Sequence, residues 1–136
     1  AYANSLWSHI DMETGMPAKL TDEDTAGYVL EEKLDMEYAP RKIIVPGEPV
    51  KGESVIIRPH HLDTNHHVNN GQYVRIALDS LNKDCRIRQL RAEYKKQSYL
   101  NDVLTPYVSV SEDGIYVVVL KDEQDATVCV VEIQEN

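Results

Sequence analysis

Cysteine is scarce in this sequence, and long apolar runs are absent. The two cysteines, Cys85 and Cys129, are too few for a disulfide framework and lack the spacing of metal ligands, so we expect reduced thiols in a cytoplasmic protein. No apolar run approaches the roughly 18 residues that span a bilayer. The opening residues Ala1 to Asn4 lack the basic region and apolar stretch of an export signal. We therefore expect neither a membrane span nor export.

Positive charge is also in short supply, because the formal net charge at pH 7 is −9. Such a balance disfavours nonspecific binding to nucleic acid, whose phosphates attract basic surfaces. Residues 75–96 are the exception, since they contain seven bases and three acids. This stretch predicts a docking surface for an acidic macromolecule. A solvated helix end and strand face with long basic side chains is the alternative interpretation.

A chain of 136 residues holds one compact domain plus extensions. Residues 1–10 are rich in β-forming residues but have no partner hairpin close behind them, which predicts the last strand of a missing preceding unit. Residues 11–37 contain nine acids, two lysines and a helix start at Thr21 to Asp24, as in a linker. Prolines and glycines then punctuate the chain. We assign residues 1–50 to this strand and an acidic interdomain linker, and residues 51–136 to one domain.

Hydrophobic periodicity predicts one helix and five strands in that domain. The helix is expected at about residues 69–83, because Val74, Ala77, Leu78 and Leu81 share one helical face. Strands are expected at about 53–58, 87–97, 103–111, 115–121 and 126–133, with a hairpin turn at Glu112-Asp113-Gly114. The helix is too apolar to lie in water. We therefore predict an α+β fold in which a curled antiparallel five-stranded sheet wraps around one long helix.

A polar segment lies between the first predicted strand and the helix. It reads Asp63-Thr64-Asn65-His66-His67-Val68-Asn69-Asn70, and Tyr73 follows one turn later. Asn69 or Asn70 can cap the helix, whose first amides are unpaired donors with partial positive charge. On an extended loop, Asp63, Asn65 and His67 project to the same side. A carboxylate, an amide and an imidazole beside oxyanion donors can orient and deprotonate a water and stabilise the oxyanion that forms when the water attacks a carbonyl.

The pattern D-x-N-x-H-V-N-N-x-x-Y at a helix start resembles the motif of the acyl-acyl-carrier-protein (acyl-ACP) thioesterases of plants and bacteria. Members of that family are tandem hot-dog folds, and the motif lies in the second hot-dog unit. The resemblance implies that Asp63, Asn65 and His67 are catalytic. The segments Ser5-Leu6-Trp7 and Thr14-Gly15-Met16-Pro17 are similar to the end of the first unit and the start of the interdomain linker.

A second segment, Ala92 to Ser98, is similar to the family's strand that reads E-Y-x-x-E before a cysteine or alanine. The last glutamate of that pattern takes part in catalysis in the family, and this chain has Gln97 in its place. Ser98 stands where the plant enzymes have cysteine. An uncharged amide can hold a water but cannot accept its proton, so we expect Gln97 to hold the water or the substrate.

Together these patterns predict hydrolysis of a fatty acyl thioester to free fatty acid and carrier protein, which terminates fatty acid synthesis. Helix-start amides polarise the carbonyl, while Asn65 and His67 activate a water. Asn69, Asn70 and Tyr73 contact the substrate, and the acyl chain lies in an apolar groove between helix and sheet or against a partner. No cofactor or metal is expected. The predicted partners are acyl carrier protein and a second hot-dog unit, either the missing N-terminal half or a second copy.

Other functions fit parts of the same sequence. A hot-dog thioesterase acting on acyl-coenzyme A would use the same loop, and Gln97 is compatible with a non-catalytic acyl-binding module. A metal site formed by His60, His61, His66 and His67 is the third alternative, although their spacing matches no standard zinc pattern.

Individual residues also have purely structural interpretations. Asp63 and Asn65 can form Asx-turns that lead into a helix cap. Tyr73 can serve packing alone. A nucleophilic role for Ser98 lacks a neighbouring base in the sequence.

Overall fold

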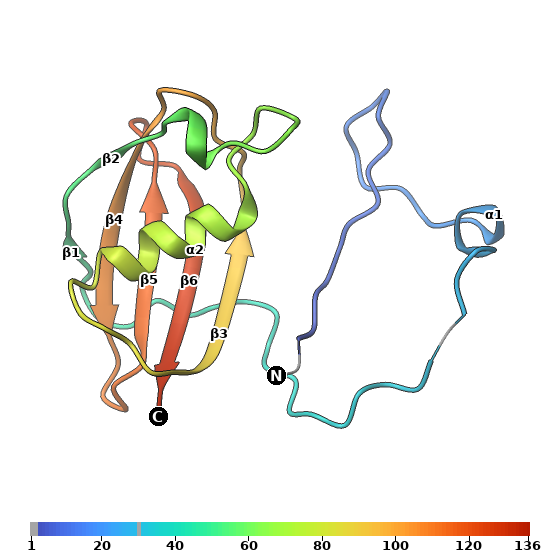
Figure 1. Cartoon of the computed structure of the whole chain (residues 1–136). Coiled ribbons are helices and arrows are strands. Elements are labelled where there is room, and N and C mark those ends of the chain that lie inside the picture. Colours follow the sequence, from blue (N-terminus) through green and yellow to red (C-terminus); the bar gives the residue numbers. More distant parts are fainter. Residues whose placement is uncertain (1–2, 30) are drawn as a thin grey trace. The chain divides into compact units, whose positions relative to one another are not determined.

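A six-stranded antiparallel sheet with one helix across it forms the main body of the protein (Figure 1). This computed structural model describes residues 3–29 and 31–136. The chain divides into two units, Ala1–Tyr38 and Ala39–Asn136. In the second unit the strand order is β1-β4-β5-β6-β3, and β2 also pairs with β4. The strands are β1 (Val50–Lys51), β2 (Val55–Ile56), β3 (Ile87–Tyr94), β4 (Val103–Val110), β5 (Tyr116–Lys121) and β6 (Thr127–Glu135).

The prediction of five strands was one too few, because the first predicted strand is two short ones. Both β1 and β2 pair with β4, and Gly52 lies between them. The Gly52 amide donates to the Pro106 carbonyl at 2.8 Å. A Cβ atom at position 52 would lie 3.1 Å from Pro106 Cγ, so glycine permits this close approach. The other four predicted strands are confirmed, and each shifts by no more than a few residues at its ends.

The helix α2 (Asn70–Asp79) is shorter than predicted. Its buried residues are Tyr73, Ile76 and Ala77, and Leu81 also packs against the core although it lies beyond the helix. Asn82 adopts a left-handed conformation with φ of 51°, which ends the turn. The apolar pattern therefore extends past the end of the helix, because Leu81 still contacts the core from the turn that follows α2.

Two clusters of apolar side chains cover the two faces of the sheet. Between α2 and the sheet lie the buried residues of the larger cluster, which include Ile57, Leu104, Val118, Leu120, Val131 and Ile133. On the opposite face, Val117, Val119 and Val130 pack against Ile43. The alternation of side chains along β5 and β6 produces this division. Residues 39–46, here called the covering segment, therefore shield the face that α2 does not reach.

The first unit contains a short hairpin and a short helix. Ile10 and Pro17 form an isolated bridge, and the Asp11 carboxylate accepts the amides of Glu13 and Thr14 in the turn. The helix α1 (Asp22–Thr25) begins with a capping box at Thr21, which confirms the predicted helix start. Within 3–10 the strand predicted over residues 1–10 is present only as that bridge, and residues 1 and 2 lie outside the described residues. None of the helices in the described part of the chain is long and apolar enough to cross a membrane.

Candidate active site

Residues 62–68, here called the motif loop, fold into a closed loop before the start of α2. A bridge between Leu62 and Val68 closes the loop, and the Asp63 amide donates to the His67 carbonyl at 2.8 Å. The Asp63 carboxylate accepts the backbone amides of Asn65 at 2.8 Å and of His67 at 3.2 Å. His66 adopts a left-handed conformation with φ of 61°. Asp63 thus forms the Asx-turn that was its structural interpretation, and it holds the backbone that carries His67.

This geometry corrects the expectation of an extended loop. A left-handed residue between Asn65 and His67 breaks the two-residue alternation that would place Asp63, Asn65 and His67 on one side. No hydrogen bond joins these three side chains, all of which belong to described residues. Asn65 is exposed, and His67 is half-buried. Asp63 therefore orients His67 through the main chain, and the amide and imidazole keep their polar atoms available.

The start of α2 is capped as predicted. Asn69 is the N-cap, and its side-chain oxygen accepts the Gly71 amide at 2.9 Å. The Asn69 carbonyl accepts the Gln72 amide at 2.8 Å. Within the described residues, the Asn70 amide has no such acceptor, so it is the donor left at the positive end of the helix.

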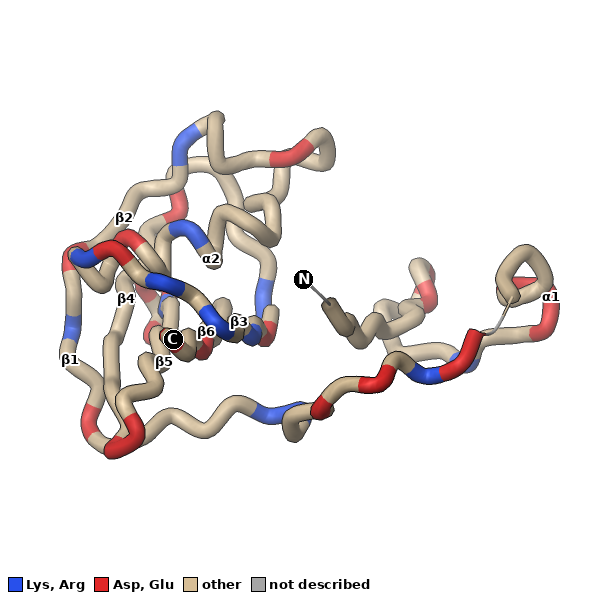
Figure 2. Tube along the Cα trace, turned by 60° about the horizontal axis from the view of Figure 1, so that its bottom comes forward, with Lys and Arg blue, Asp and Glu red and all other residues tan. Residues whose placement is uncertain are grey.

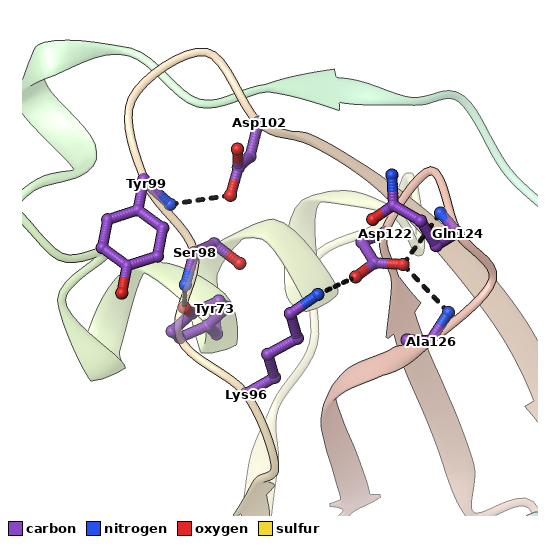
Figure 3. A network of polar contacts seen from close by, with 8 residues as sticks. All are labelled: Tyr73, Lys96, Ser98, Tyr99, Asp102, Asp122, Gln124 and Ala126. Atoms are coloured by element: carbon purple, nitrogen blue, oxygen red, sulfur yellow. Dashed lines mark hydrogen bonds and ion pairs between the residues drawn. The ribbon is translucent and has the colours of Figure 1, made fainter.

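The connection from β3 to β4 carries Gln97 and lies against the motif loop. The Val68 amide donates to the Ser98 carbonyl at 2.9 Å. The Ser98 amide donates to the Tyr73 hydroxyl, also at 2.9 Å (Figure 3). Lys96 forms an ion pair with Asp122, whose carboxylate also accepts the amides of Gln124 and Ala126 in the β5–β6 turn (Figure 3). The Lys96 ammonium lowers the pKa of Asp122. The connection is therefore fixed to neighbouring elements at Lys96 and at Ser98.

Tyr99 is a residue of this site that the sequence analysis missed. Its ring meets the His67 ring edge to face, with centroids 5.2 Å apart. Its hydroxyl donates to the Gln97 side-chain oxygen at 3.4 Å. Tyr99 therefore stands between the imidazole and the amide. Its position two residues after Gln97, on the same side of an extended segment, was the available signal.

Two predicted residues lie deeper than expected. Tyr73 is 3% exposed and packs in the core, and burial raises the pKa of its hydroxyl although bonds from Ser98 oppose that rise. Ser98 is 1% exposed, which leaves no room for a bulky thioester and argues against a nucleophilic serine. Asn70 is exposed, and its carbonyl accepts the Tyr94 hydroxyl at 3.2 Å.

Comparison with known families gives the site its context. A family model described as the acyl-ACP thioesterase C-terminal domain matches residues 49–136. The chain belongs to this family. The match covers the motif loop, α2 and all of the long strands, and it confirms the resemblance carried by the Asp63-to-Tyr73 pattern. No curated protein sequence matches the chain significantly.

Solved structures of the acyl-ACP thioesterase family share the fold. An acyl-ACP thioesterase from Bacteroides thetaiotaomicron is 28% identical, with a TM-score of 0.75 over 93% of this chain and 53% of its own. The 12:0-ACP thioesterase from Umbellularia californica is 19% identical, with a TM-score of 0.70 over 93% and 52%. The chain thus spans about half the length of these relatives. The likeness confirms the predicted hot-dog fold, with six strands in place of five and a shorter helix.

A further solved structure shows the same fold at lower similarity. The hypothetical protein SAV2348 from Staphylococcus aureus, solved in complex with CoA, is 17% identical, with a TM-score of 0.56 over 67% of this chain and 75% of its own.

A cavity of about 620 Å³ lies at the other end of α2 in this acyl-ACP thioesterase domain. Its lining runs from Arg75 on α2 to Ile87 at the start of β3 and includes Leu78, Lys83 and Cys85. None of the motif residues lines it. The space between α2 and the sheet at the centre of the domain is filled by the larger apolar cluster.

The basic stretch of the domain is largely compensated by acids. Arg75, Lys83, Arg91, Lys95 and Lys96 each pair with a carboxylate. Three of those carboxylates, Glu135, Glu132 and Asp122, lie outside the stretch. Figure 2 accordingly shows Lys and Arg positions with Asp and Glu positions close by around β3. Among the described residues, Arg86 and Arg88 are the bases of this stretch without an ion pair.

Histidine and cysteine side chains are the candidates for metal and thiol chemistry in the domain. The described part of the domain contains no cluster of three or more His, Cys, Asp or Glu side chains that could hold an ion. His60 and His61 stack on each other with centroids 4.0 Å apart, and the Arg58 amide donates to His61 Nδ1. Cys85 and Cys129 are both free, and burial raises the pKa of the Cys129 thiol to about 12.

Proposed function

We propose that this chain is the catalytic part of an acyl-ACP thioesterase, which hydrolyses a fatty acyl thioester to free fatty acid and carrier protein and so terminates fatty acid synthesis. The observation that carries the proposal is the position of His67. Its imidazole stands on a rigid loop directly before the capped, positive end of α2, in a chain of the acyl-ACP thioesterase family.

The reaction uses the groups at this helix end. The thioester carbonyl oxygen accepts the Asn70 amide, which is the unoccupied donor of the first turn. Asn65 orients a water, His67 takes its proton, and the oxygen attacks the carbonyl carbon. When the tetrahedral intermediate collapses, the carbon–sulfur bond breaks and the thiolate takes the proton from His67. Gln97, held by the Tyr99 hydroxyl, binds the water or the substrate.

The acyl chain needs an apolar surface that the isolated domain does not offer between helix and sheet. We therefore place the groove against a second hot-dog unit. Strand β3 supports such pairing, because it ends the sheet and its residues Ile87, Leu90 and Tyr94 expose 41%, 36% and 45% of their surface. Coverage of 93% of this chain by the Bacteroides enzyme supports the assignment of residues 1–50 to the end of such a unit and its linker.

The carrier half of the substrate needs a docking surface on the domain. Arg86 and Arg88 remain for an acidic carrier protein, while most other bases of the stretch are neutralised by neighbours. Acyl-coenzyme A is the second candidate substrate, because the similar SAV2348 protein was solved in complex with CoA. A cytoplasmic location stays a prediction.

One assay tests both candidates on the full-length gene product. The same acyl group is offered on carrier protein and on coenzyme A, and we expect hydrolysis of the carrier-bound form to have at least about tenfold higher kcat/KM. His67→Ala is expected to lower kcat by about 100-fold or more. His66→Asn is the matched control, since asparagine tolerates the left-handed backbone, and it should retain activity within about threefold. A preference for acyl-coenzyme A, or a fully active His67→Ala protein, would contradict the proposal.

Gln97→Glu separates an enzyme from a binding module. In the enzyme, a carboxylate at this position can share the proton and raise kcat by about tenfold from a measurable parent rate. A parent that binds acyl chains but hydrolyses none, with activity appearing only in the glutamate variant, would identify a non-catalytic acyl-binding module.

A further inference from the structure

The motif loop and the Gln97 segment meet at one residue, Ser98. Its carbonyl accepts the Val68 amide, and its amide donates to the Tyr73 hydroxyl. Ser98 is therefore bonded on one side to the loop that carries His67 and on the other side to helix α2. Figure 3 shows the Tyr73 hydroxyl directed at this amide from the helix.

The neighbours of Ser98 are Gln97 and Tyr99, and Tyr99 links the Gln97 side chain to the imidazole. Gln97 precedes Ser98, and Tyr99 follows it with its ring against His67. The Tyr99 hydroxyl then returns to the Gln97 side chain. Any shift of the Ser98 backbone therefore moves both groups relative to His67. The Tyr99 amide is held by the Asp102 carboxylate at 2.9 Å, so the backbone on the far side of Ser98 has its own anchor (Figure 3).

Packing alone does not account for a tyrosine at position 73. The ring fills a core site beside Tyr94, with centroids 6.0 Å apart, and phenylalanine would fill the same volume. Burial of a phenolic hydroxyl is unfavourable unless the hydroxyl is bonded. In this site its partner is a backbone amide that has lost contact with water, because Ser98 is buried.

From this geometry we infer that Tyr73 is a positioning residue, which sets the place of Gln97 and Tyr99 relative to His67 through the Ser98 amide. The inference rests on the proposed hydrolysis and assigns Tyr73 a role other than the substrate contact predicted from its place in the motif. The hydroxyl acts at a distance from the reacting atoms, so its loss changes the rate of the chemical step more than substrate binding.

The test compares Tyr73→Phe with Tyr116→Phe in the full-length protein. Tyr116 also loses a bonded hydroxyl, since it accepts Lys83 at 2.9 Å, but it lies on β5 away from the motif. We expect Tyr73→Phe to lower kcat by about tenfold with KM within about twofold, and Tyr116→Phe to leave both near the parent values. Equal losses in the two variants, or a Tyr73→Phe effect confined to KM, would overturn the inference.

A double-mutant cycle with Gln97→Ala tests the route of the effect. If Tyr73 acts through the Gln97 segment, Tyr73→Phe adds less than about twofold to the loss already caused by Gln97→Ala. Losses that multiply in the double variant would show that the hydroxyl acts independently of Gln97, and would overturn the inference.

An NMR measurement, which does not depend on catalysis, tests this inference separately from the proposed function. In NMR spectra of the parent and Tyr73→Phe proteins, we expect faster exchange of the Ser98 amide and shifted signals from the His67 ring and the Gln97 side chain. If the parent hydrolyses no thioester, these shifts still support positioning, while unchanged spectra overturn it. Should Tyr73→Phe fail to fold, 3,5-difluorotyrosine at position 73 keeps the volume and weakens the acceptor, and the same signals should move in the same direction by less.

Discussion

The covering-segment face of the sheet and the loops at the start of α2 use charged and polar side chains in opposite ways. On the face of the covering segment, Glu93 accepts the Ile43 amide and pairs with Lys95, and Arg91 bonds Glu132 and the Pro40 carbonyl. At the helix end, Asp63 bonds only backbone amides, and Asn65 and Gln97 stay exposed. Charges that hold structure are saturated by partners, while groups intended for a ligand keep free lone pairs and protons.

Glu93 and Gln97 make the contrast within one segment. They lie four residues apart, and both belong to the pattern that resembles the family's strand. Register separates them: Glu93 is opposite Val130, on the covering-segment face, whereas Gln97 lies beyond the end of β3. Burial raises the pKa of Glu93, but Lys95 and the Ile43 amide outweigh that effect and leave the pKa below its usual value. Its carboxylate is therefore committed to the covering segment.

The largest expected effect comes from the helix end. Asp63→Ala removes the acceptor for two amides and should lower kcat by about 100-fold, because a loop displaced by about 1 Å misplaces His67. Asp63→Asn keeps an oxygen acceptor and should stay within about fivefold of the parent. Steady-state hydrolysis measures both. If Asp63→Asn is as inactive as Asp63→Ala, the negative charge itself is needed and the backbone role is insufficient.

The covering-segment face should respond in stability and not in catalysis. Glu132→Ala leaves the largely buried Arg91 without its carboxylate and should lower the free energy of unfolding by about 2 kcal/mol. The control Glu135→Ala breaks a more exposed pair with Lys83 and should cost less than about 1 kcal/mol. Denaturant unfolding measures both, with kcat/KM expected to stay within about twofold. A large loss of kcat in Glu132→Ala would show that the covering-segment face also affects catalysis at the start of α2.

The smallest effect concerns His61, which lies in the sequence between the covering segment and the motif loop. Burial, aided by His60, lowers the pKa of His61 below the ordinary 6.5. The folded protein therefore favours the neutral ring that accepts the Arg58 amide, while the unfolded chain binds a proton. This contribution to stability is complete above 6.5 and is lost as the pH falls from there through the folded-state pKa. Unfolding free energies measured from pH 7.5 down to about pH 5 should fall less steeply for His61→Gln. Identical slopes would contradict the assignment.

Sequence alone located most of the fold and the polar motif. The alternation along residues 115–121 and 126–133 and the cap at Asn69 are local signals, and the structure follows them. The sequence did not reveal the covering segment, because the contact of Ile43 with Val117, Val119 and Val130 joins residues far apart in the chain. The loop conformation also escaped prediction, since His66 takes a left-handed conformation that histidine adopts only occasionally.

Where no second hot-dog unit covers it, strand β3 presents its outer backbone groups to any extended chain that approaches, and open edges of this kind promote aggregation. Arginines at positions 86 and 88 stand at the beginning of that edge without an ion pair within the described residues. Their mutual repulsion between molecules opposes unwanted stacking of one edge on another. Neutralising both should therefore reduce the concentration at which the purified protein stays clear, even where its folding and its chemistry are unaltered.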